Sequence, residues 1–512
     1  MTASIPSNSA EFFHAARKHR GTITLCVILA TVLQTLDATI ANVALPHMQG
    51  ALSATSDQIA WVLTSYLIAA AIVTPSIGWL VGRFGRRRMF LLSMSGFTIA
   101  SMLCGAAQTL EEMVIFRLLQ GLCGASLIPM GQSVMLDLYE PHERAGAMAV
   151  WSMGIMLGPV AGPTLGAFLT DNYSWRYVFY VNLPLGVLGF IGMWAFFPRS
   201  RAVRNPFDWT GFCALATGIA GLQLVLDRGQ TKNWFSSNEI LIEAAMALLG
   251  FYLFFVHNTL APKPLLRRAL FRDRNFVACL GMQFACGIVL NSTAALLPPY
   301  FQGLGGYPVM LSGLSMAPRG IGTIIASPLV SKLITRVDPR KLMALGLISL
   351  SYSTYAMTSW TPDTTVMQQI PMVMLQGATI SLVFVPLQII AFSTLKPDLR
   401  TEGSGVIALM RSMGGSIGVA VMETELARHI QVSRQDLSQF TTQFNRNLTG
   451  GAPAHWFNLH TLSGRSVLDA VVNQQAAIMA YKDDFYLMTM VILPTALLVF
   501  LMRRPGSIKP QT

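Results

Sequence analysis

The sequence predicts an all-α integral membrane protein of fourteen transmembrane helices, in which two related halves flank two inserted helices. Of its 512 residues, 53% are hydrophobic and only 12% are charged, whereas soluble domains carry about 25% charged residues. Apolar runs of the length that crosses a bilayer, about 20 residues, recur along the whole chain. Several short motifs of the first half also return in the second half.

The long apolar runs are expected to be helices, because a segment in hydrocarbon must satisfy its backbone amides and carbonyls by its own hydrogen bonds. Boundaries follow from the ends of the apolar runs. The expected spans are 22–44, 58–80, 89–107, 113–136, 146–169, 177–197, 207–227, 239–259, 275–300, 311–332, 342–360, 368–392, 403–423 and 484–502.

The spans divide the chain into three membrane units between two tails. Residues 22–200 form an expected N-terminal bundle of six helices, 201–274 hold the two inserted helices, and 275–502 form a C-terminal bundle of six helices. Residues 424–483 are expected to be a long periplasmic loop within the C-terminal unit. The tails are 1–21 and 503–512.

The positive charges predict the orientation. Most of the 36 Lys and Arg residues fall in one alternate set of connections, while the other connections before the last one hold only Arg176, Arg228 and Lys232. Cytoplasmic loops carry the excess of positive charge, so both termini are expected in the cytoplasm. The net charge of +12 therefore needs no nucleic-acid partner.

An internal repeat relates the two halves. The stretch that begins at Pro75 resembles the one that begins at Pro328, and LQG at Leu119 returns at Leu375, with a shift of about 255 residues. Gly158 and Gly162 likewise match Gly414 and Gly418. Many secondary transporters consist of such repeats, which rock about a central site to open to each side in turn.

Asp37 in the first helix is the leading candidate for a coupling site. A charged carboxylate at mid-bilayer costs roughly 2.5 to 3.5 kcal/mol, so such a residue marks a functional site by default. If Asp37 lines a cavity, it is expected to exchange protons there, with Gln34 and Asn42 near it as hydrogen-bonding groups. The alternative, a carboxylate held in a structural polar cluster or a helix cap, stays open.

Arg117 in the fourth helix is the second buried charge, and an intramembrane arginine normally pairs with a carboxylate or with backbone carbonyls. It is expected either to shape the proton route or to serve a structural pair. Further polar candidates for a central cavity lie in other spans: Gln120, Gln283, Asn291, Gln376 and Arg411.

The fifth helix carries glycine at every fourth position. Gly154, Gly158, Gly162 and Gly166 share one face, which allows a second helix to approach closely. Pro159 and Pro163 follow two of these glycines and favour bending. A hinge or a tight seal is expected here, and close packing alone is the alternative.

A basic segment follows the second helix. Gly85 offers a tight turn, and the segment also contains Gly78, Arg83, Arg86, Arg87 and Arg88. These arginines either set the topology or bind neighbouring helix ends and thereby hold a gate closed.

No enzyme or metal motif is present in the sequence. HExxH is absent, as are a GxSxG with suitable partners and the GxxxxGK[ST] loop of ATP-driven pumps. We therefore expect no catalytic residue, metal ligand or cofactor.

Read together, these motifs resemble those of the major facilitator superfamily. The segment GWLVGRFGRRR from Gly78, FRLLQG around Arg117 and GPVAGPTLG from Gly158 are similar to three of its motifs. LDATIANVALP in the first helix, WRYVFYVNLPLG from Trp175 and LDRGQTKNWF after the seventh helix narrow the resemblance to fourteen-helix drug:proton antiporters of the EmrB and QacA type, closest to the Gram-negative EmrB branch.

The resemblance implies proton-coupled export of hydrophobic or amphipathic drugs across a bacterial inner membrane by alternating access. Asp37 and Arg117 match the acidic and basic helix positions of the family, and a periplasmic adaptor and an outer-membrane channel are the partners it implies. Gly82 stands where the loop motif usually has Asp, so the salt bridge of that Asp is not expected here. Transport of one specific metabolite stays open, as does a membrane-embedded sensor or enzyme.

Overall fold

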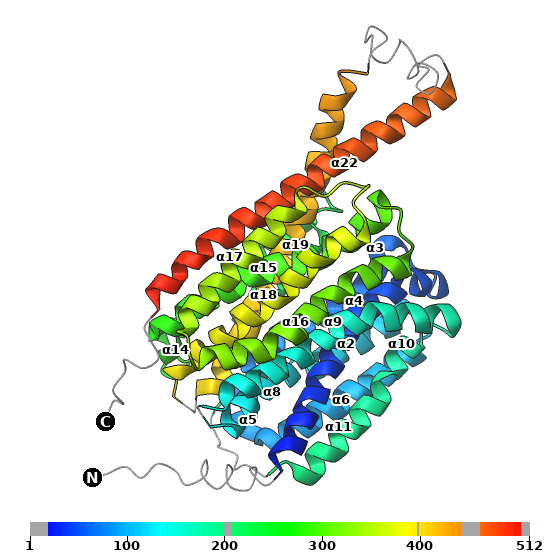
Figure 1. Cartoon of the computed structure of the whole chain (residues 1–512). Coiled ribbons are helices and arrows are strands. Elements are labelled where there is room, and N and C mark those ends of the chain that lie inside the picture. Colours follow the sequence, from blue (N-terminus) through cyan, green and yellow to red (C-terminus); the bar gives the residue numbers. More distant parts are fainter. Residues whose placement is uncertain (1–18, 141, 199–205, 397–398, 442–460, 503–512) are drawn as a thin grey trace, which may run out of the picture.

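The computed structural model describes residues 19–140, 142–198, 206–396, 399–441 and 461–502, and this part of the chain is helical with no strand. Long helices run side by side along one common direction (Figure 1). The start of α2 and the end of α22 lie at one end of the bundle, which we call the terminal end. We call the opposite end, where α22 projects, the arm end.

The first half contains six of the expected spans, three of them broken into shorter pieces. Pro75 interrupts the second span and Val181 separates the two pieces of the sixth. The elements are α2 (Arg20–Ala51), α3 (Ser56–Ile59), α4 (Trp61–Val73), η1 (Thr74–Ser76), α5 (Ile77–Phe84), α6 (Arg86–Ala106), α7 (Leu110–Gly124), α8 (Leu127–Leu138), α9 (Arg144–Asn172), α10 (Tyr177–Tyr180) and α11 (Asn182–Phe196).

The inserted helices follow, and then the second half. The insert contains α12 (Trp209–Arg228), η2 (Trp234–Ser236), α13 (Asn238–Leu260) and α14 (Ala269–Arg272). The second half contains α15 (Arg274–Pro299), η3 (Tyr300–Leu304), α16 (Val309–Ile334), α17 (Pro339–Met357), α18 (Val366–Ser393), α19 (Arg400–Ser438), α22 (Leu462–Ile492) and η5 (Leu493–Leu501). Helix α12 packs against α4 of the first half and α19 of the second, and α13 packs on α12.

Each of the fourteen expected spans coincides with a helical segment. Within the described residues, twelve of these segments are long and apolar enough to cross a membrane, and the other two are α16 and α17. Both carry many polar residues for their length, including Arg319 in α16 and Arg340 with Lys341 at the start of α17. Both pack along α18, where Ser327 of α16 contacts Ser381, and Ser353 of α17 donates to the Met372 carbonyl.

The segment 424–483, expected to be a loop, is largely helical where the structure describes it. Helix α19 continues to Ser438, and α22 begins at Leu462. Figure 1 shows the two as arms that project beyond the bundle. Each helix continues without a break past its apolar span. An ion pair of 2.8 Å between Arg434 and Asp469 joins the two helices there.

The sequence repeat is also a structural repeat. A Cβ on Gly121 would lie 2.4 Å from the carbonyl oxygen of Tyr66, and a Cβ on Gly377 would lie against the same atom of Arg319. Gly121 and Gly377 are equivalent in the repeat, as are Tyr66 and Arg319. The same close helix contact is therefore made once in each half.

Candidate functional site

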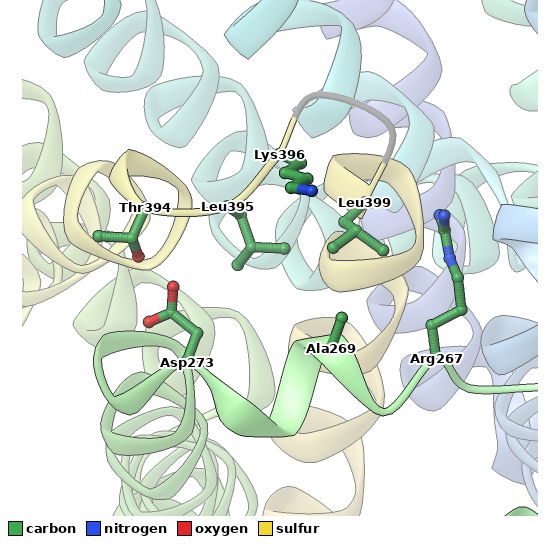
Figure 2. A pocket seen from close by; sticks show the side chains of 7 residues that line it. All are labelled: Arg267, Ala269, Asp273, Thr394, Leu395, Lys396 and Leu399. Atoms are coloured by element: carbon green, nitrogen blue, oxygen red, sulfur yellow. The ribbon is translucent and has the colours of Figure 1, made fainter. Parts of the chain in front are cut away.

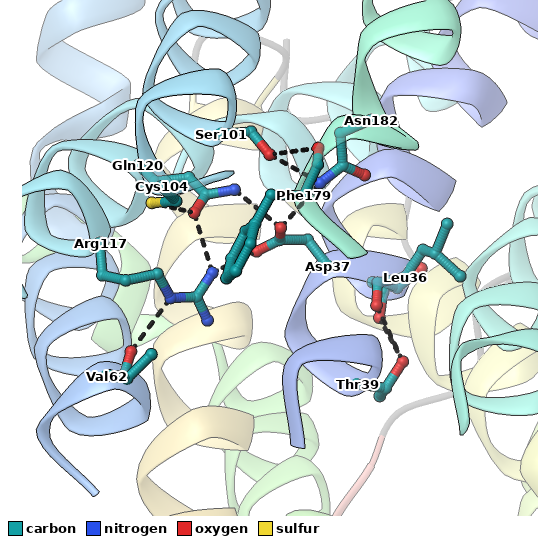
Figure 3. Close-up of polar contacts among 11 residues, drawn as sticks. Leu36, Asp37, Thr39, Val62, Ser101, Cys104, Arg117, Gln120, Phe179 and Asn182 are labelled. Carbon is teal, nitrogen blue, oxygen red and sulfur yellow. Dashed lines mark hydrogen bonds and ion pairs between the residues drawn. The ribbon is translucent and has the colours of Figure 1, made fainter. Parts of the chain in front are cut away.

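Asp37 lies in the middle of α2, on the side that faces the other helices of the first half. Its side chain has 0% exposed surface. Three donors reach its carboxylate: Nη1 of Arg117 at 2.7 Å, Nε2 of Gln120 at 2.7 Å and Nδ2 of Asn182 at 2.8 Å (Figure 3). The carboxylate is thus held as an ion pair with two further hydrogen bonds.

Arg117 on α7 binds both charged and neutral partners. Besides Asp37, its guanidinium donates to the Val62 carbonyl at 3.0 Å and to Gln120 Oε1 at 2.8 Å. It also stacks over the ring of Tyr66, with 4.5 Å between Cζ and the ring centroid. Its Nη2 has no hydrogen-bond partner among the described residues. Since the side chain is completely buried, Asp37 provides its balancing charge.

Asn182 and Ser101 extend this cluster and were not predicted as site residues. Asn182 Nδ2 donates to Ser101 Oγ at 3.0 Å as well as to Asp37, and Ser101 Oγ donates to the carbonyl of Phe179 at 2.9 Å. The break between α10 and α11 positions Asn182 at the first turn of α11. The motif WRYVFYVNLPLG contained Asn182, but a lone asparagine in an apolar run carries no signal of its partner.

The cluster is sealed in this conformation. Asp37, Arg117, Gln120 and Asn182 each have 0% exposed surface, so the cavity expected around Asp37 does not reach it here. A buried ion pair of this kind is retained only with good geometry and added hydrogen bonds, which this cluster supplies. Opening the site therefore requires the helices of the first half to separate.

The other predicted cavity residues are scattered, and of that set only Gln120 joins the Asp37 cluster. Asn42 and Asn291 are exposed, and Gln34 accepts a hydrogen bond from the backbone of Ile128 at 3.2 Å. Gln376 is buried and donates to Thr293 at 3.3 Å. Gln283 is buried with both amide atoms unpartnered among the described residues, and Arg411 is half-buried.

The glycine face of α9 packs against the helix that carries Asp37. A Cβ on Gly158 would lie 2.3 Å from Thr35 Oγ1 and 2.6 Å from the backbone nitrogen of Leu36, and one on Gly162 would lie 2.2 Å from Thr39 Oγ1. Gly154 and Gly166 face Ile28 and Ile40 in the same way. Thr39 donates to the Gly158 carbonyl at 3.1 Å, so this face forms a tight contact along α2.

The prolines of α9 lie beside the contact between the two halves. The helix runs from Arg144 to Asn172 through both Pro159 and Pro163 without interruption. A Cβ on Gly313 of α16 would lie 3.8 Å from Pro163, and α9 packs along α16 over much of its length. Helix α9 therefore links the Asp37 helix to the second half.

At the terminal end, Asp137 bridges the two halves. Asp137 Oδ2 pairs with Arg86 at 2.6 Å, and Asp137 Oδ1 accepts from Arg400 of α19 at 2.5 Å. Arg86 of the basic segment thus binds a side chain at the end of α8. The acid comes from α8 rather than from position 82, where Gly82 stands.

The remaining residues of the basic segment have different surroundings. Arg83 and Arg88 are exposed, and Arg87 donates to the carbonyl of Trp194. Gly85 adopts a φ of 82° between α5 and α6, a conformation that glycine accepts at little cost. A Cβ on Gly78 would lie 2.9 Å from Cβ of Glu402 in the second half, so Gly78 allows the halves to meet.

A cavity of about 280 Å³ also lies at the terminal end (Figure 2). Asp273 at the start of α15 lines it, together with Thr394, Leu395, Lys396 and Leu399. None of the predicted site residues lines it. Among the residues that the structure describes, no group of three His, Cys, Asp or Glu side chains could hold a metal ion.

Comparison with known proteins assigns the family. A model of the Major Facilitator Superfamily matches residues 27–419. The chain is 33% identical over 498 residues to the multidrug export protein EmrB of Haemophilus influenzae, covering 94% of this chain and 96% of that protein. It is 31% identical to the fatty acid resistance protein FarB of Neisseria gonorrhoeae, over 94% of this chain and 96% of FarB.

Solved structures agree on the fold. The human organic anion transporter MFSD10 superposes with a TM-score of 0.58 at 14% identity, over 92% of this chain and 99% of that one. The proton:xylose symporter XylE gives a TM-score of 0.57 at 13% identity, over 94% and 95% of the two chains. The chain is thus a multi-pass membrane transporter that belongs to the major facilitator superfamily, and within it to the group that contains the EmrB multidrug export proteins.

Proposed function

We propose that the protein exports hydrophobic or amphipathic drugs in exchange for protons, by alternating access, across the inner membrane of a bacterium with both termini in the cytoplasm. The observation that carries the proposal is the sealed Asp37–Arg117 pair of 2.7 Å inside the first half. The names of two relatives, a multidrug export protein and a fatty acid resistance protein, support apolar compounds as the substrate class.

The pair is specific to one half, which favours a functional role. Gly158 packs on Leu36, and its repeat counterpart Gly414 packs on Phe284. By this correspondence Ala285 and Val373 stand where the first half has Asp37 and Arg117. A pair that only served packing would be expected in both halves.

Protonation of Asp37 would couple proton uptake to movement. A proton on the carboxylate removes the negative charge that balances Arg117, and an unpaired buried charge costs several kcal/mol. Arg117 must then reach water or another partner, which opens the packing between α2 and α7. One inward proton supplies about 2.3 kcal/mol per 100 mV and about 1.4 kcal/mol per pH unit.

Substrate contacts are proposed between α15 and α19. Gln283 on α15 offers an amide with no partner among the described residues, and the half-buried Arg411 on α19 offers a guanidinium. The two helices approach closely, because a Cβ on Gly287 would lie 2.4 Å from the Arg411 carbonyl oxygen. A polar or charged group of a bound drug would satisfy these side chains.

An adaptor protein is the proposed partner at the arm end. The arms of α19 and α22 project beyond the bundle (Figure 1), and Val432, Val467 and Val471 are exposed on them beside the Arg434–Asp469 ion pair. A helix of a periplasmic adaptor with both apolar and charged side chains would be complementary to this mixed surface. Val467→Glu should weaken copurification of a co-expressed adaptor, whereas Phe235→Glu, at an exposed residue between α12 and α13, should leave it unchanged.

Everted membrane vesicles test the proposed exchange. A vesicle that holds a proton gradient should lose part of it when a transported drug is added, and Asp37→Asn should abolish this response. Asp171→Asn, at an exposed aspartate of α9, serves as the control and should respond like the wild type. A broad drug panel without any response, in vesicles with correctly inserted protein, would refute the exchange.

A further inference from the structure

A second carboxyl group is buried far along the chain from the Asp37 cluster. Asp484 on α22 has 0% exposed surface, and both of its carboxyl oxygens lack a hydrogen-bond partner among the described residues. It shares a buried face of α22 with Ala480, Tyr481 and Met488. One turn further on, by contrast, Thr489 pairs with Thr354 of α17 at 2.9 Å.

The charges that act on Asp484 do not stabilise an anion. Glu425 of α19 and Asp483 of α22 are both negative. His429 of α19 lies between them, with Nε2 3.7 Å from Glu425 and Nδ1 3.8 Å from Asp483. Tyr481 on the same face of α22 is a phenol and supplies no positive charge. Glu423 of α19, which acts on Tyr481, is a further carboxyl group. The cation Arg428 is mostly exposed and lies 3.9 Å from Glu425.

Tyr481 and Phe485, the buried neighbours of this acid on α22, belong to an aromatic cluster. Tyr300 lies 5.2 Å from Tyr481 and 6.2 Å from Phe485 between ring centroids, and Trp360 lies 6.3 Å from Phe485. Tyr300 and Phe485 are almost completely buried. Among the described residues, no side chain of this cluster donates a hydrogen bond to the acid.

An ionised carboxylate in such a place would cost several kcal/mol, because nothing replaces its hydration. The neutral acid avoids this cost. We propose that Asp484 is a second proton-binding site of this transporter, which holds its proton in the conformation described here and releases it at the arm end when α19 and α22 separate. The role of Asp484 in the transport cycle rests on the proposed antiport. The presence of a proton on Asp484 does not depend on that proposal.

A route outward is available on the same two helices. Asp483 is 59% exposed, and Glu425 and His429 are about one-third exposed. Release would break the O–H bond of the acid and pass the proton to water or to the imidazole of His429. The resulting imidazolium would lie between the carboxylates of Glu425 and Asp483, which stabilise it.

Infrared spectroscopy of the full chain in liposomes tests for the bound proton without any transport. At pH 7 the wild type should show the carbonyl stretch of a protonated carboxyl group, and this band should be missing in Asp484→Asn. Asp483→Asn should keep the band, because that side chain is solvated. Asp37→Asn should also keep it, since Asp37 is held in an ion pair with Arg117, so the result is independent of the proposed Asp37 mechanism.

The pH dependence of stability gives a second readout. An aspartate in the unfolded chain ionises near pH 4, so a folded state that keeps Asp484 neutral takes up one proton on folding above that pH. Rising pH should then destabilise the wild type relative to Asp484→Asn, by about tenfold in the unfolding equilibrium per pH unit. Asp484→Ser also removes the acid and replaces the asparagine variant if that one does not accumulate.

Two results would overturn the proposal. One is an infrared spectrum of Asp484→Asn or Asp484→Ser that retains the full wild-type band. The other concerns the unfolding free energies of wild type, Asp484→Asn and Asp483→Asn. If the differences among them stay constant from pH 5 to pH 8, the proposal fails, since a neutral Asp484 must change the difference between wild type and Asp484→Asn as the pH rises.

Discussion

Gln132 of α8 donates a hydrogen bond to Gln388 of α18, and the two residues occupy equivalent positions in the two halves, 256 residues apart. The sequence repeat has the same shift at LQG, which begins at Leu119 and again at Leu375. The pair therefore lies where an approximate two-fold axis relates the halves. Nearby, Ser133 contacts Thr401 at 2.8 Å and Ser404 donates to the Pro129 carbonyl at 2.9 Å. The two halves are thus closed against each other toward the terminal end.

A disulfide between these positions should lock that closed state. In a variant without the six native cysteines, Gln132→Cys with Gln388→Cys should form a crosslink on oxidation and stop drug transport, because the halves can no longer separate there. A reductant should restore transport. Either single cysteine variant serves as the control, and crosslinked protein that still transports would contradict the assignment of this contact to a moving interface.

Asp137 should hold the same end closed through its two ion pairs. Asp137→Asn leaves Arg86 and Arg400 without their shared carboxylate, so the terminal end should open more often. We expect faster thiol labelling of a cysteine placed at Gln388 and a loss of transport. The exposed Glu111→Gln on α7 is the matched control, and equal labelling rates in the two variants would argue against a latch at Asp137.

The protein should lose far more stability when only Arg117 of the buried pair is replaced than when both Asp37 and Arg117 are replaced. Arg117→Leu leaves Asp37 charged and unpaired, and breaking a buried pair in this way costs about 3 to 5 kcal/mol. Asp37→Leu with Arg117→Leu removes both charges and should recover most of that loss. Thermal unfolding in detergent measures both effects.

The double leucine variant should regain stability but not transport. The double leucine variant should fold and insert but fail to couple drug movement to protons, because no titratable carboxyl remains in the cluster. Arg117→Lys should fall between wild type and Arg117→Leu, since an ammonium cannot reach Val62, Gln120 and Asp37 with the planar geometry of a guanidinium. A double variant with wild-type coupling would remove Asp37 from the mechanism.

Gly158→Ala tests the contact between α9 and α2. Its Cβ would lie 2.3 Å from Thr35 Oγ1 and 2.5 Å from the Thr35 carbonyl carbon, so the helices must separate, at a cost of about 1 to 3 kcal/mol. Both thermal stability and drug resistance should fall. Gly82→Ala is the matched control, because a Cβ at that position would have no neighbouring side chain or distant backbone atom within 4 Å, and it should behave like the wild type.

Much of the architecture follows from the sequence alone. Hydrocarbon leaves the backbone no option but helix, so fourteen apolar runs became fourteen helical segments at nearly the expected positions. The repeat and the glycine spacing of α9 are local patterns. In the structure they coincide with equivalent helix contacts in the two halves and with the close approach of α9 to α2. Asp37 and Arg117 stood out because charge is expensive at that depth.

Only the tertiary structure decided which polar groups meet. Asn182, Asp137 and Asp484 carried no signal in the sequence. The roles of Asn182 and Asp137 depend on partners up to 263 positions away. The role of Asp484 depends on its having no hydrogen-bond partner among the described residues. It was likewise packing that sealed Asp37 and carried α19 and α22 out beyond the bundle as helical arms. Local pattern determines which segments are helical, but burial and pairing are properties of surfaces that come together only in the folded chain.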